Sequence, residues 1–255
     1  MSYERLEQLG KGSFSTVYRG RRVFTGQMVA LKVIPVAKKS APELNALRSE
    51  ITILRRLDHP NIIALLDVVE TASELTVVTE LAQGELLEAL LEDGALPAAV
   101  VRSVAAQLTR ALAYLHARGV MHRDLKPQNV LVAAGGRVKL CDFGFARDIP
   151  AVLMTSIKGT PLYMAPEMFK CSAYSPSADV WGLGVLLFEM AKGAPPFYAA
   201  DLAALVARVV SEEVDVDAEA GFPEALRGFL KLCLVKEPAA RATWAALLEH
   251  PWLAA

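Results

Sequence analysis

The spacing of apolar and polar residues predicts a strand-rich segment followed by a helical one. Up to about residue 80 the apolar runs are short, and the run at residues 29–34 is typical of a buried strand. A period of two places Ala30, Lys32 and Ile34 on one face of this strand and its other three residues on the opposite face. Two further strands are predicted within residues 68–78, around a polar turn.

One helix is expected between these strands. Ser40 and Glu43 have the spacing of a capping box, and a proline lies between them in the first turn. The His-Pro-Asn sequence at residues 59–61 ends the segment. Apolar residues recur at helical intervals and predict a buried stripe at Leu44, Leu47, Ile51 and Leu54.

Beyond about residue 83, helical spacing dominates. An amphipathic helix is predicted from Pro97 to about Ala117, and two short strands flank the glycine turn at residues 134–136. We therefore expect one α+β domain over residues 1–255, with a strand-rich N-lobe over about 1–82 and a helical C-lobe over about 83–255. The remaining helices are predicted near residues 178–192, 199–211, 223–233 and 242–249.

Composition and charge exclude several classes of protein. The 255 residues carry a formal net charge of −1, which argues against a broad nucleic-acid or membrane-binding surface. The three cysteines form no pattern of pairs, as is typical of reduced thiols in the cytosol. The first residues lack the apolar core of a signal peptide, and the longest apolar run, Val180–Met190, is too short to span a membrane. A cytoplasmic protein without membrane insertion is expected.

The candidate chemistry is concentrated in two short motifs. They are His-Arg-Asp-Leu-Lys-Pro-Gln-Asn, which ends at Asn129, and Asp-Phe-Gly, which begins at Asp142. Such a set suits phosphoryl transfer, in which positioning and charge neutralisation matter more than covalent chemistry. Asp124 is the expected catalytic base, and Lys126 can neutralise charge on the phosphoryl group. The metal ligands, suited to Mg²⁺ by their oxygen atoms, are expected to be Asn129 and Asp142.

Neighbours of these motifs have other expected roles. Arg123 is a cation placed to meet a negatively charged activation segment. His122 is expected to pack under Phe143 as a structural residue, in preference to acting as an acid or a base. Cys141 is expected to be a small core residue, with a reactive thiol as the alternative.

A glycine-containing loop and a buried lysine are expected to meet phosphates. Residues 10–17, Gly-Lys-Gly-Ser-Phe-Ser-Thr-Val, let backbone amides approach an anion, although the pattern by itself also fits a hairpin turn. Lys32 lies in an apolar strand, where it needs an opposite charge. Glu50, beside the apolar stripe, is the preferred protein partner, and Glu43 is the alternative. A lysine that snorkels at a strand edge is the remaining interpretation.

With these motifs in this order, the chain resembles a eukaryotic protein kinase catalytic domain over essentially its whole length. The resemblance also rests on Ala-Pro-Glu at residues 165–167, Asp-Val-Trp-Gly at residues 179–182, and Arg241. It implies a bilobal fold with a small antiparallel sheet and one helix in the N-lobe and a larger, mainly helical C-lobe. It also implies an ATP- and Mg²⁺-dependent enzyme that phosphorylates proteins, with Lys32, Glu50 and Asp124 among its catalytic residues.

The resemblance assigns the nucleotide site residue by residue. It implies that Thr79 is the gatekeeper and that backbone groups of Glu80 and Ala82 meet adenine. Glu85 is expected to reach the ribose. Ser15 replaces the third glycine of the family pattern, which leaves the contribution of this loop to affinity open. The remaining expected nucleotide contacts are Leu9, Gly10, Lys11, Gly12, Ser13, Val17, Ala30, Lys32, Leu131 and Asp142.

Other implied roles are structural. Glu167 is expected to pair with Arg241, and Asp179 is expected to brace the catalytic loop. An internal apolar spine is expected to stack from Leu54, His122 and Phe143.

The expected acceptor is serine or threonine. Within the family, Lys126 and Thr160 mark kinases that act on hydroxyls of short side chains. Met164 stands where proline-directed kinases usually carry an arginine, and Gln128 replaces an acid that arginine-preferring kinases often use. Proline-directed or strongly basic target sites are therefore not expected.

Three strings resemble one group within the family, the Fused kinases. They cover residues 77–86, 140–147 and 155–164. The group implies roles in Hedgehog signalling, cytokinesis or ciliary assembly, with kinesin-like or cytoskeletal partners and a cytoskeletal or ciliary location. The Unc-51-like kinases are the nearest alternative. Because the long C-terminal repeat region of the Fused group is missing from these residues, an isolated catalytic domain or a shorter relative is expected.

Regulation and two competing functions complete the expectations. Ser156 is the expected phosphorylation site, with Thr155 beside it, and a phosphate there could pair with Arg123. Two ordinary loop hydroxyls are the alternative. A pseudokinase would use the same fold as a scaffold, although every catalytic residue named above is present. A small-molecule phosphotransferase is disfavoured because residues 159–167 resemble a peptide-docking segment.

Overall fold

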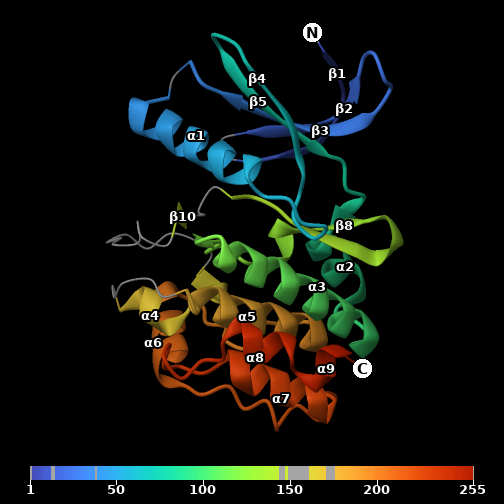
Figure 1. The fold of residues 1–255 in the computed structure, drawn as a ribbon. Coiled ribbons are helices and arrows are strands. Elements are labelled where there is room, and N and C mark those ends of the chain that lie inside the picture. The colour runs from blue at the N-terminus through green and yellow to red at the C-terminus, as the bar shows by residue number, and fades with distance from the viewer. Residues whose placement is uncertain are drawn as a thin grey trace.

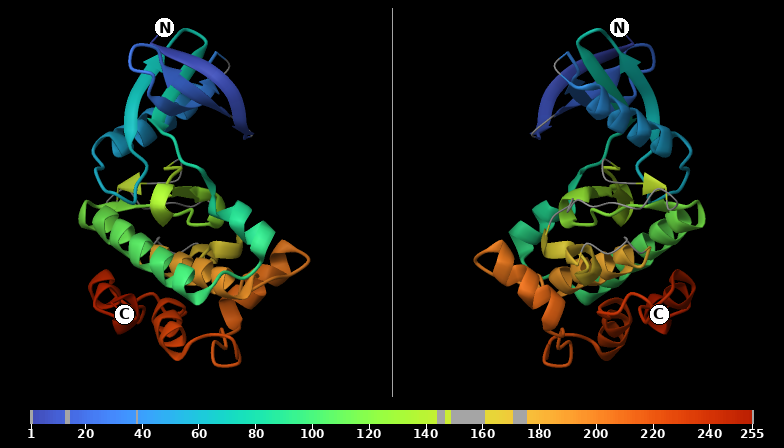
Figure 2. Two further views of the ribbon diagram at one scale, coloured as in Figure 1. Left: turned by 90° about the vertical axis from the view of Figure 1, so that its right-hand side faces the viewer. Right: turned by 90° about the vertical axis from the view of Figure 1, so that its left-hand side faces the viewer.

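The computed structural model describes residues 2–12, 15–37, 39–143, 147–148, 161–170 and 176–254. In Figure 1 a twisted β-sheet with one helix lies above a larger body of helices. Figure 2 shows the same two lobes from either side, with the N-terminus in the sheet and the C-terminus in the helical lobe. This arrangement confirms the expected α+β fold of two lobes.

The N-lobe is built on an antiparallel sheet with the strand order β1-β2-β3-β5-β4. Its strands are β1 (Tyr3–Lys11), β2 (Thr16–Arg22), β3 (Met28–Pro35), β4 (Leu65–Glu70) and β5 (Glu74–Glu80). The residues of β3 alternate between its two faces, as the period of two predicts. Val29, Leu31 and Val33 share one apolar cluster, whereas Ile34 joins Ile51 of the helix in another.

Helix α1 (Ala41–Arg55) packs on one face of this sheet. Its first turn is fixed by Ser40, whose amide and hydroxyl both donate to Glu43 Oε2, at 2.8 and 2.6 Å. The predicted stripe turns inward and is buried at Ile51 and Leu54. The cap and the stripe together fix which side of the helix faces β3.

Helices make up most of the C-lobe. They are α2 (Leu86–Asp93), α3 (Ala98–Ala117), α4 (Pro166–Phe169), α5 (Ala178–Lys192), α6 (Leu202–Ser211), α7 (Glu224–Cys233), α8 (Trp244–Leu248) and α9 (Pro251–Ala254). Helix α5 is buried on almost every side, so the other helices pack around it. Within the described residues, no helix has the length and apolar character needed to cross a membrane.

Short strands lie on the side of the C-lobe nearest the N-lobe (Figure 1). A small sheet has the order β6-β8-β9, formed by Gly84–Glu85, Val130–Ala133 and Arg137–Leu140. A second pair joins β7 (Val120–Met121) to β10 (Arg147–Asp148). The glycine turn between β8 and β9 needs residues without a Cβ, because both of its glycines have positive φ.

Helices α2 and α6 differ from the sequence expectation, and the four-residue helices α4 and α9 were not predicted either. Helix α2 is missing from the predicted elements because its 8 residues are too short to show a clear helical period. Helix α6 begins at Leu202 rather than near residue 199. Asp201 sets this start, because its Oδ1 accepts from the Ala204 amide at 2.8 Å and caps the helix.

The loop between α1 and β4 is tied to the C-lobe. The Leu140 amide donates to the Asn61 carbonyl, and the Ile63 amide donates to the Leu140 carbonyl, both at 2.9 Å. The Asn61 side chain also donates to Gln107 Oε1 of α3 and to the Val138 carbonyl, at 2.7 and 3.0 Å. This loop therefore gives the two lobes a fixed point of contact.

A glycine inside α5 tests the packing of the C-lobe. A Cβ added at Gly184 would lie 2.7 Å from Cys233 Cβ and 2.8 Å from Leu234 Cδ2. We expect Gly184→Ala to lower the free energy of unfolding by about 1–3 kcal/mol through overpacking. Urea unfolding followed by circular dichroism would measure the change.

Gly228→Ala in α7 is the matched control. Its added Cβ would meet His250 Nε2 at 3.7 Å, an ordinary contact. Alanine is the better helix former, so stability should stay unchanged or rise by about 0.5–1 kcal/mol. Equal losses in the two variants would contradict the packing explanation.

Candidate active site

Lys32 of β3 meets two carboxylates. Its Nζ lies 3.4 Å from Glu50 Oε1 of α1 and 3.5 Å from Asp142 Oδ1, just beyond β9. Burial alone would lower the pKa of Lys32, but the two carboxylates outweigh burial and raise the pKa. The lysine is therefore charged. Of the two glutamates considered, the structure brings Glu50 to Lys32 and keeps Glu43 in the cap of α1.

Asp124 lies in a cluster of polar side chains between β7 and β8. Lys126 Nζ is 2.8 Å from Asp124 Oδ2. Asn129 Nδ2 donates to Asp124 Oδ2 at 2.9 Å and to the Asp124 carbonyl at 2.7 Å. These two bonds use both amide hydrogens of Asn129, which leaves its Oδ1 as the atom that can bind a cation. The loop holds a carboxylate, an ammonium and an amide oxygen as one unit.

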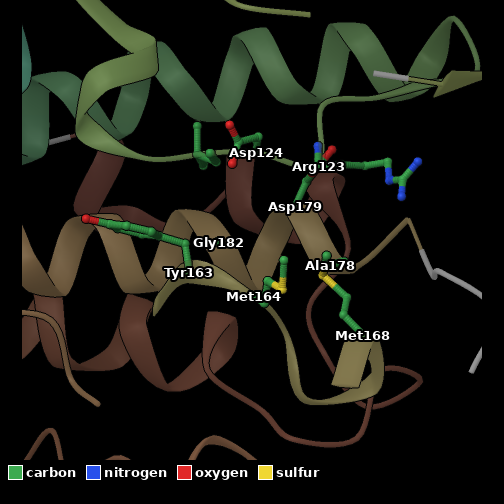
Figure 3. Close-up of a pocket in the computed structure, with 9 residues that line it drawn as sticks. Arg123, Asp124, Tyr163, Met164, Met168, Ala178, Asp179 and Gly182 are labelled. Carbon is green, nitrogen blue, oxygen red and sulfur yellow. Dashed lines mark hydrogen bonds between the residues drawn. The ribbon is translucent and has the colours of Figure 1, made fainter. Parts of the chain in front are cut away.

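Asp179, near the start of α5, holds the backbone of this catalytic loop. Its Oδ2 accepts from the His122 amide and its Oδ1 from the Arg123 amide, both at 2.8 Å. Figure 3 shows the side chain directed towards the backbone at Arg123. Burial would raise the pKa of Asp179, but the hydrogen bond from His116 and these nearby donors lower it. The structure thus shows the expected brace.

The backbone of the site is strained at two positions. Arg123 has a φ of 71° and Asp142 has a φ of 59°. Both lie in the left-handed region, which residues other than glycine rarely adopt. Such conformations persist when the surroundings impose them and are concentrated at functional sites. At Arg123, the hydrogen bond that its backbone amide donates to Asp179 supplies that constraint.

His122 and Cys141 are structural residues. The His122 ring packs edge-on against Phe143, with centroids 5.2 Å apart, and its Nε2 lies 3.0 Å from the Cys141 carbonyl oxygen. Leu54 and Phe143 share the large apolar cluster, as the expected spine requires. Burial, followed by the nearby Asp142 charge, raises the pKa of the Cys141 thiol to about 12. The thiol is therefore protonated at neutral pH, which favours the core role.

The expected phosphate and adenine contacts of the N-lobe fall on paired positions of the sheet. Val17 of β2 pairs with Gly10 of β1 and with Lys32 of β3. Ala30 of β3 pairs with Thr79 of β5. These registers place an apolar side chain, the gatekeeper position and the partly buried Lys32 on neighbouring strands.

The tip of the glycine loop is partly described. Leu9 and Lys11 are exposed residues of β1, and the Gly12 amide donates to the Ser15 carbonyl at 2.8 Å across the turn. Ser13, an expected contact, lies outside the described residues, as do Gly144, Thr155, Ser156 and Thr160.

The expected hinge contacts lie where the lobes join. Glu80 ends β5, Ala82 lies in the connection to β6, and Glu85 of β6 pairs with Leu131 of β8. Desolvation and the neighbouring Glu88 raise the pKa of Glu85. Glu85, the expected ribose contact, thus lies beside Leu131, an expected nucleotide contact, on the neighbouring strand.

Lys139 is a residue of this region that the sequence analysis missed. Its Nζ, on β9, lies 2.7 Å from Glu80 Oε1, which also accepts from the Ala64 amide at 2.8 Å. The ion pair joins the hinge to the C-lobe. A signal was available, because Lys139 interrupts an apolar strand just as Lys32 does and needs a carboxylate for the same reason.

Asn129 and Asp142 offer the oxygen atoms that Mg²⁺ prefers. In the part of the chain that is described, no group of three or more His, Cys, Asp or Glu side chains could hold a metal by itself. Mg²⁺ needs only one or two protein ligands when water and phosphate oxygens complete its shell. The donor set therefore fits an ion that arrives with a nucleotide better than a structural metal.

A buried ion pair joins α4 to the segment that precedes α8. Arg241 Nη1 and Nη2 donate to Glu167 Oε1 and Oε2, at 2.8 and 3.1 Å. This two-point geometry matches the planar guanidinium to the carboxylate. The expected pairing of these residues is therefore present.

Comparison with known proteins identifies the family. Over residues 3–253 the chain matches the protein kinase domain. The chain belongs to the protein kinase family. It is 50% identical over 253 residues to serine/threonine-protein kinase TIO of Arabidopsis thaliana and 48% identical over 254 residues to serine/threonine-protein kinase 36 of Pongo abelii. Serine/threonine-protein kinase fused of Drosophila melanogaster is 41% identical over 247 residues.

These relatives confirm the resemblance to Fused-like serine/threonine kinase domains. The alignments cover 98%, 99% and 96% of this kinase domain, but 19%, 19% and 30% of the respective relatives. The chain thus spans between about a fifth and a third of their length. Protein kinases use ATP and Mg²⁺, which agrees with the sparse oxygen donors of the site.

The protonated state of Cys141 gives a test of the site. We expect iodoacetamide at neutral pH to modify Cys141 on the order of a hundredfold more slowly in the folded kinase domain than in the urea-unfolded chain, because the thiolate is the nucleophile. Mass spectrometry of digested samples would follow the adduct over time. Rapid labelling of the folded protein at Cys141 would favour the reactive alternative, and Cys233, whose pKa burial also raises, is an internal comparison.

Proposed function

We propose that this kinase domain transfers the γ-phosphoryl group of ATP to serine or threonine hydroxyls of proteins. The observation that carries the proposal is the single unit formed by Asp124, Lys126 and Asn129. The Lys126 ammonium and the Asn129 amide nitrogen both lie within hydrogen-bonding distance of the Asp124 carboxylate, and Asn129 Oδ1 remains to bind a metal ion. Phosphoryl transfer requires little more from a protein than this positioning and charge.

Each residue of the unit has a proposed role. Asp124 orients the acceptor hydroxyl and accepts its proton. Lys126 stabilises charge on the transferred group, and Lys32, held by Glu50, binds the α- and β-phosphates. Mg²⁺, when bound, neutralises charge on the phosphates, and the residues that would hold it are Asn129 and Asp142.

The nucleotide site is proposed to lie between the lobes. Thr79, Glu80 and Ala82 supply the gatekeeper and the hinge, and Glu85 is directed to the ribose. Support comes from the strand pairing of Thr79 with Ala30 and of Glu85 with Leu131. The remaining proposed contacts are Leu9, Gly10, Lys11, Gly12, Ser13, Val17, Ala30, Leu131 and Asp142.

The acceptor preference and the cellular role are proposed from the family. Lys126 supports serine and threonine as acceptors, and Gln128 and Met164 argue against basic or proline-directed sites. The similarity to Fused-like kinases supports a signalling, cytoskeletal or ciliary role. A cytoplasmic location and kinesin-like or cytoskeletal partners are part of the same proposal.

Asp124→Asn is the direct test. The amide cannot accept the proton, so we expect kcat to fall by about 10²–10⁴-fold, the usual contribution of general acid–base catalysis. Transfer of radiolabelled phosphate from ATP to a serine/threonine peptide library would be measured for both proteins. Asp93→Asn, at the exposed end of α2, is the control and should keep wild-type activity.

The outcomes separate the competing functions. Labelling that survives Asp124→Asn would come from a contaminating kinase. Nucleotide binding without labelling by either protein would favour the pseudokinase scaffold and overturn the proposed activity.

A second test concerns activation. A phosphate on Ser156, or on Thr155 beside it, would add negative charge that Arg123 can bind. We expect the double variant Ser156→Ala/Thr155→Ala to lose activity, and phosphopeptide mapping of the wild type to locate the phosphate. Unchanged turnover in the double variant, with an unmodified segment in the wild type, would show that these are ordinary loop hydroxyls.

A further inference from the structure

A relay of side chains from three helices ends at the catalytic loop. Trp244 Nε1, at the start of α8, donates to His116 Nδ1 of α3 at 2.8 Å. His116 Nε2 lies 2.7 Å from Asp179 Oδ2 of α5. The same Asp179 holds the amides of His122 and Arg123. The indole is therefore two hydrogen bonds away from the carboxylate that fixes the loop.

The chemistry of the indole decides the state of the imidazole. An indole nitrogen can only donate, so His116 Nδ1 must accept and cannot carry a proton. The ring proton then lies on Nε2, where it is donated to Asp179. In a doubly protonated His116, the Nδ1–H group would point at the Nε1–H group of Trp244, and neither could accept a hydrogen bond from the other. The observed geometry thus admits one neutral form of the imidazole.

We propose that Trp244 is a positioning residue for the catalytic loop, because it holds His116 in the neutral form that donates to Asp179. Trp244 itself touches neither the base nor the expected metal ligands. This inference rests on the proposed kinase activity for its functional consequence. The state of the imidazole can be measured without that activity.

The start of α8 is anchored where this role requires it. Arg241, three residues before Trp244, donates to the carbonyl of Ser177, two residues before Asp179, at 2.8 Å. Thr243 caps α8 by accepting from the Ala246 amide at 3.3 Å. Both ends of the relay are therefore tied to each other through a second, independent contact.

Burial makes the hydrogen bond of Trp244 effective. The side chains of His116 and Asp179 are 8% and 1% exposed, and the indole packs edge-on against the imidazole with centroids 5.1 Å apart. A buried donor or acceptor that loses its partner destabilises the folded state, because its desolvation is no longer compensated by a hydrogen bond. The imidazole side of this hydrogen bond is therefore shielded from water, whereas the indole itself is partly exposed.

Loss of the indole N–H would release two other states of the ring. In one, the proton moves to Nδ1 and a bare Nε2 lone pair faces Asp179. In the other, both nitrogens are protonated, and the cation draws Asp179 Oδ2 away from the His122 amide. Asp179 of α5 faces the imidazole, and Asp179 in turn interacts with His122 and Arg123 of the loop. The contact from α8 is the uncharged indole.

Trp244→Phe removes the donor and keeps an aromatic ring. We expect kcat to fall by about fivefold at neutral pH, the size of one net hydrogen bond, with the KM for ATP unchanged. We also expect this loss to grow as the pH falls, because in the variant no indole N–H opposes protonation of His116 Nδ1. The control is Trp252→Phe in α9, a buried tryptophan that packs on Phe229, which should keep the wild-type kcat and pH profile.

A second substitution separates positioning from a loss of folding. In His116→Gln the amide nitrogen can replace Nε2 as the donor to Asp179 and cannot titrate near neutral pH. Trp244→Phe should then have no effect on kcat or on the pH profile in the His116→Gln background. An equal loss of kcat in both backgrounds would show that Trp244 does not act through His116.

Nitrogen NMR of the histidine rings gives the readout that does not depend on catalysis. Wild type should show His116 protonated on Nε2 alone, and Trp244→Phe should show Nδ1 protonation increasing as the pH falls. Identical His116 signals in the two proteins would overturn the inference. An inactive wild type with the expected signals would instead overturn the proposed function and leave the tautomer assignment in place.

Discussion

The buried carboxylate of Asp179 is the constraint on which the catalytic geometry depends. A buried charge is costly unless hydrogen bonds replace its water, and Asp179 is 2% exposed. Two adjacent loop amides and the imidazole of His116 supply those bonds. Because the amides belong to adjacent residues, they fix the direction of the chain immediately before Asp124. The cost of burying the charge is thus recovered only when the loop has its catalytic conformation.

The second constraint is that the proposed catalytic groups come from two lobes. Lys32 and its partner Glu50 belong to the N-lobe, whereas Asp142 and the catalytic loop belong to the C-lobe. The contacts between the lobes include the Lys139–Glu80 ion pair and the hydrogen bonds of the loop that carries Asn61. These contacts fix one edge of the N-lobe. The distance from Lys32 to Asp142 therefore depends on the orientation of the rest of the N-lobe relative to the C-lobe.

The sequence predicted features that are local, and it missed those that depend on distant contacts. The faces of β3 follow from its period of two, and the cap of α1 follows from a serine and a glutamate three residues apart. Glu50 was found because its helix had a readable stripe. Helix α2 was too short to show a period, and the Lys139–Glu80 pair joins residues 59 positions apart. Trp244 meets a residue 128 positions away, and no local pattern encodes such a contact.

The unequal cores of the two lobes explain why ion pairs set the geometry of the site. The C-lobe, the adjoining loop and the end of α1 share one large apolar cluster, whereas the described N-lobe sheet contributes to two clusters of four buried residues each. Few buried contacts mean a smaller free-energy cost for local opening. Apolar packing alone therefore constrains Lys32 less than it constrains Asp124.

The position of the Lys32 ammonium is instead set by its ion pairs with Glu50 and Asp142. Asp142 also belongs to the expected metal site. A cation bound at the proposed metal site would therefore change the charge that Lys32 meets, and nucleotide binding would then be coupled to the position of the N-lobe.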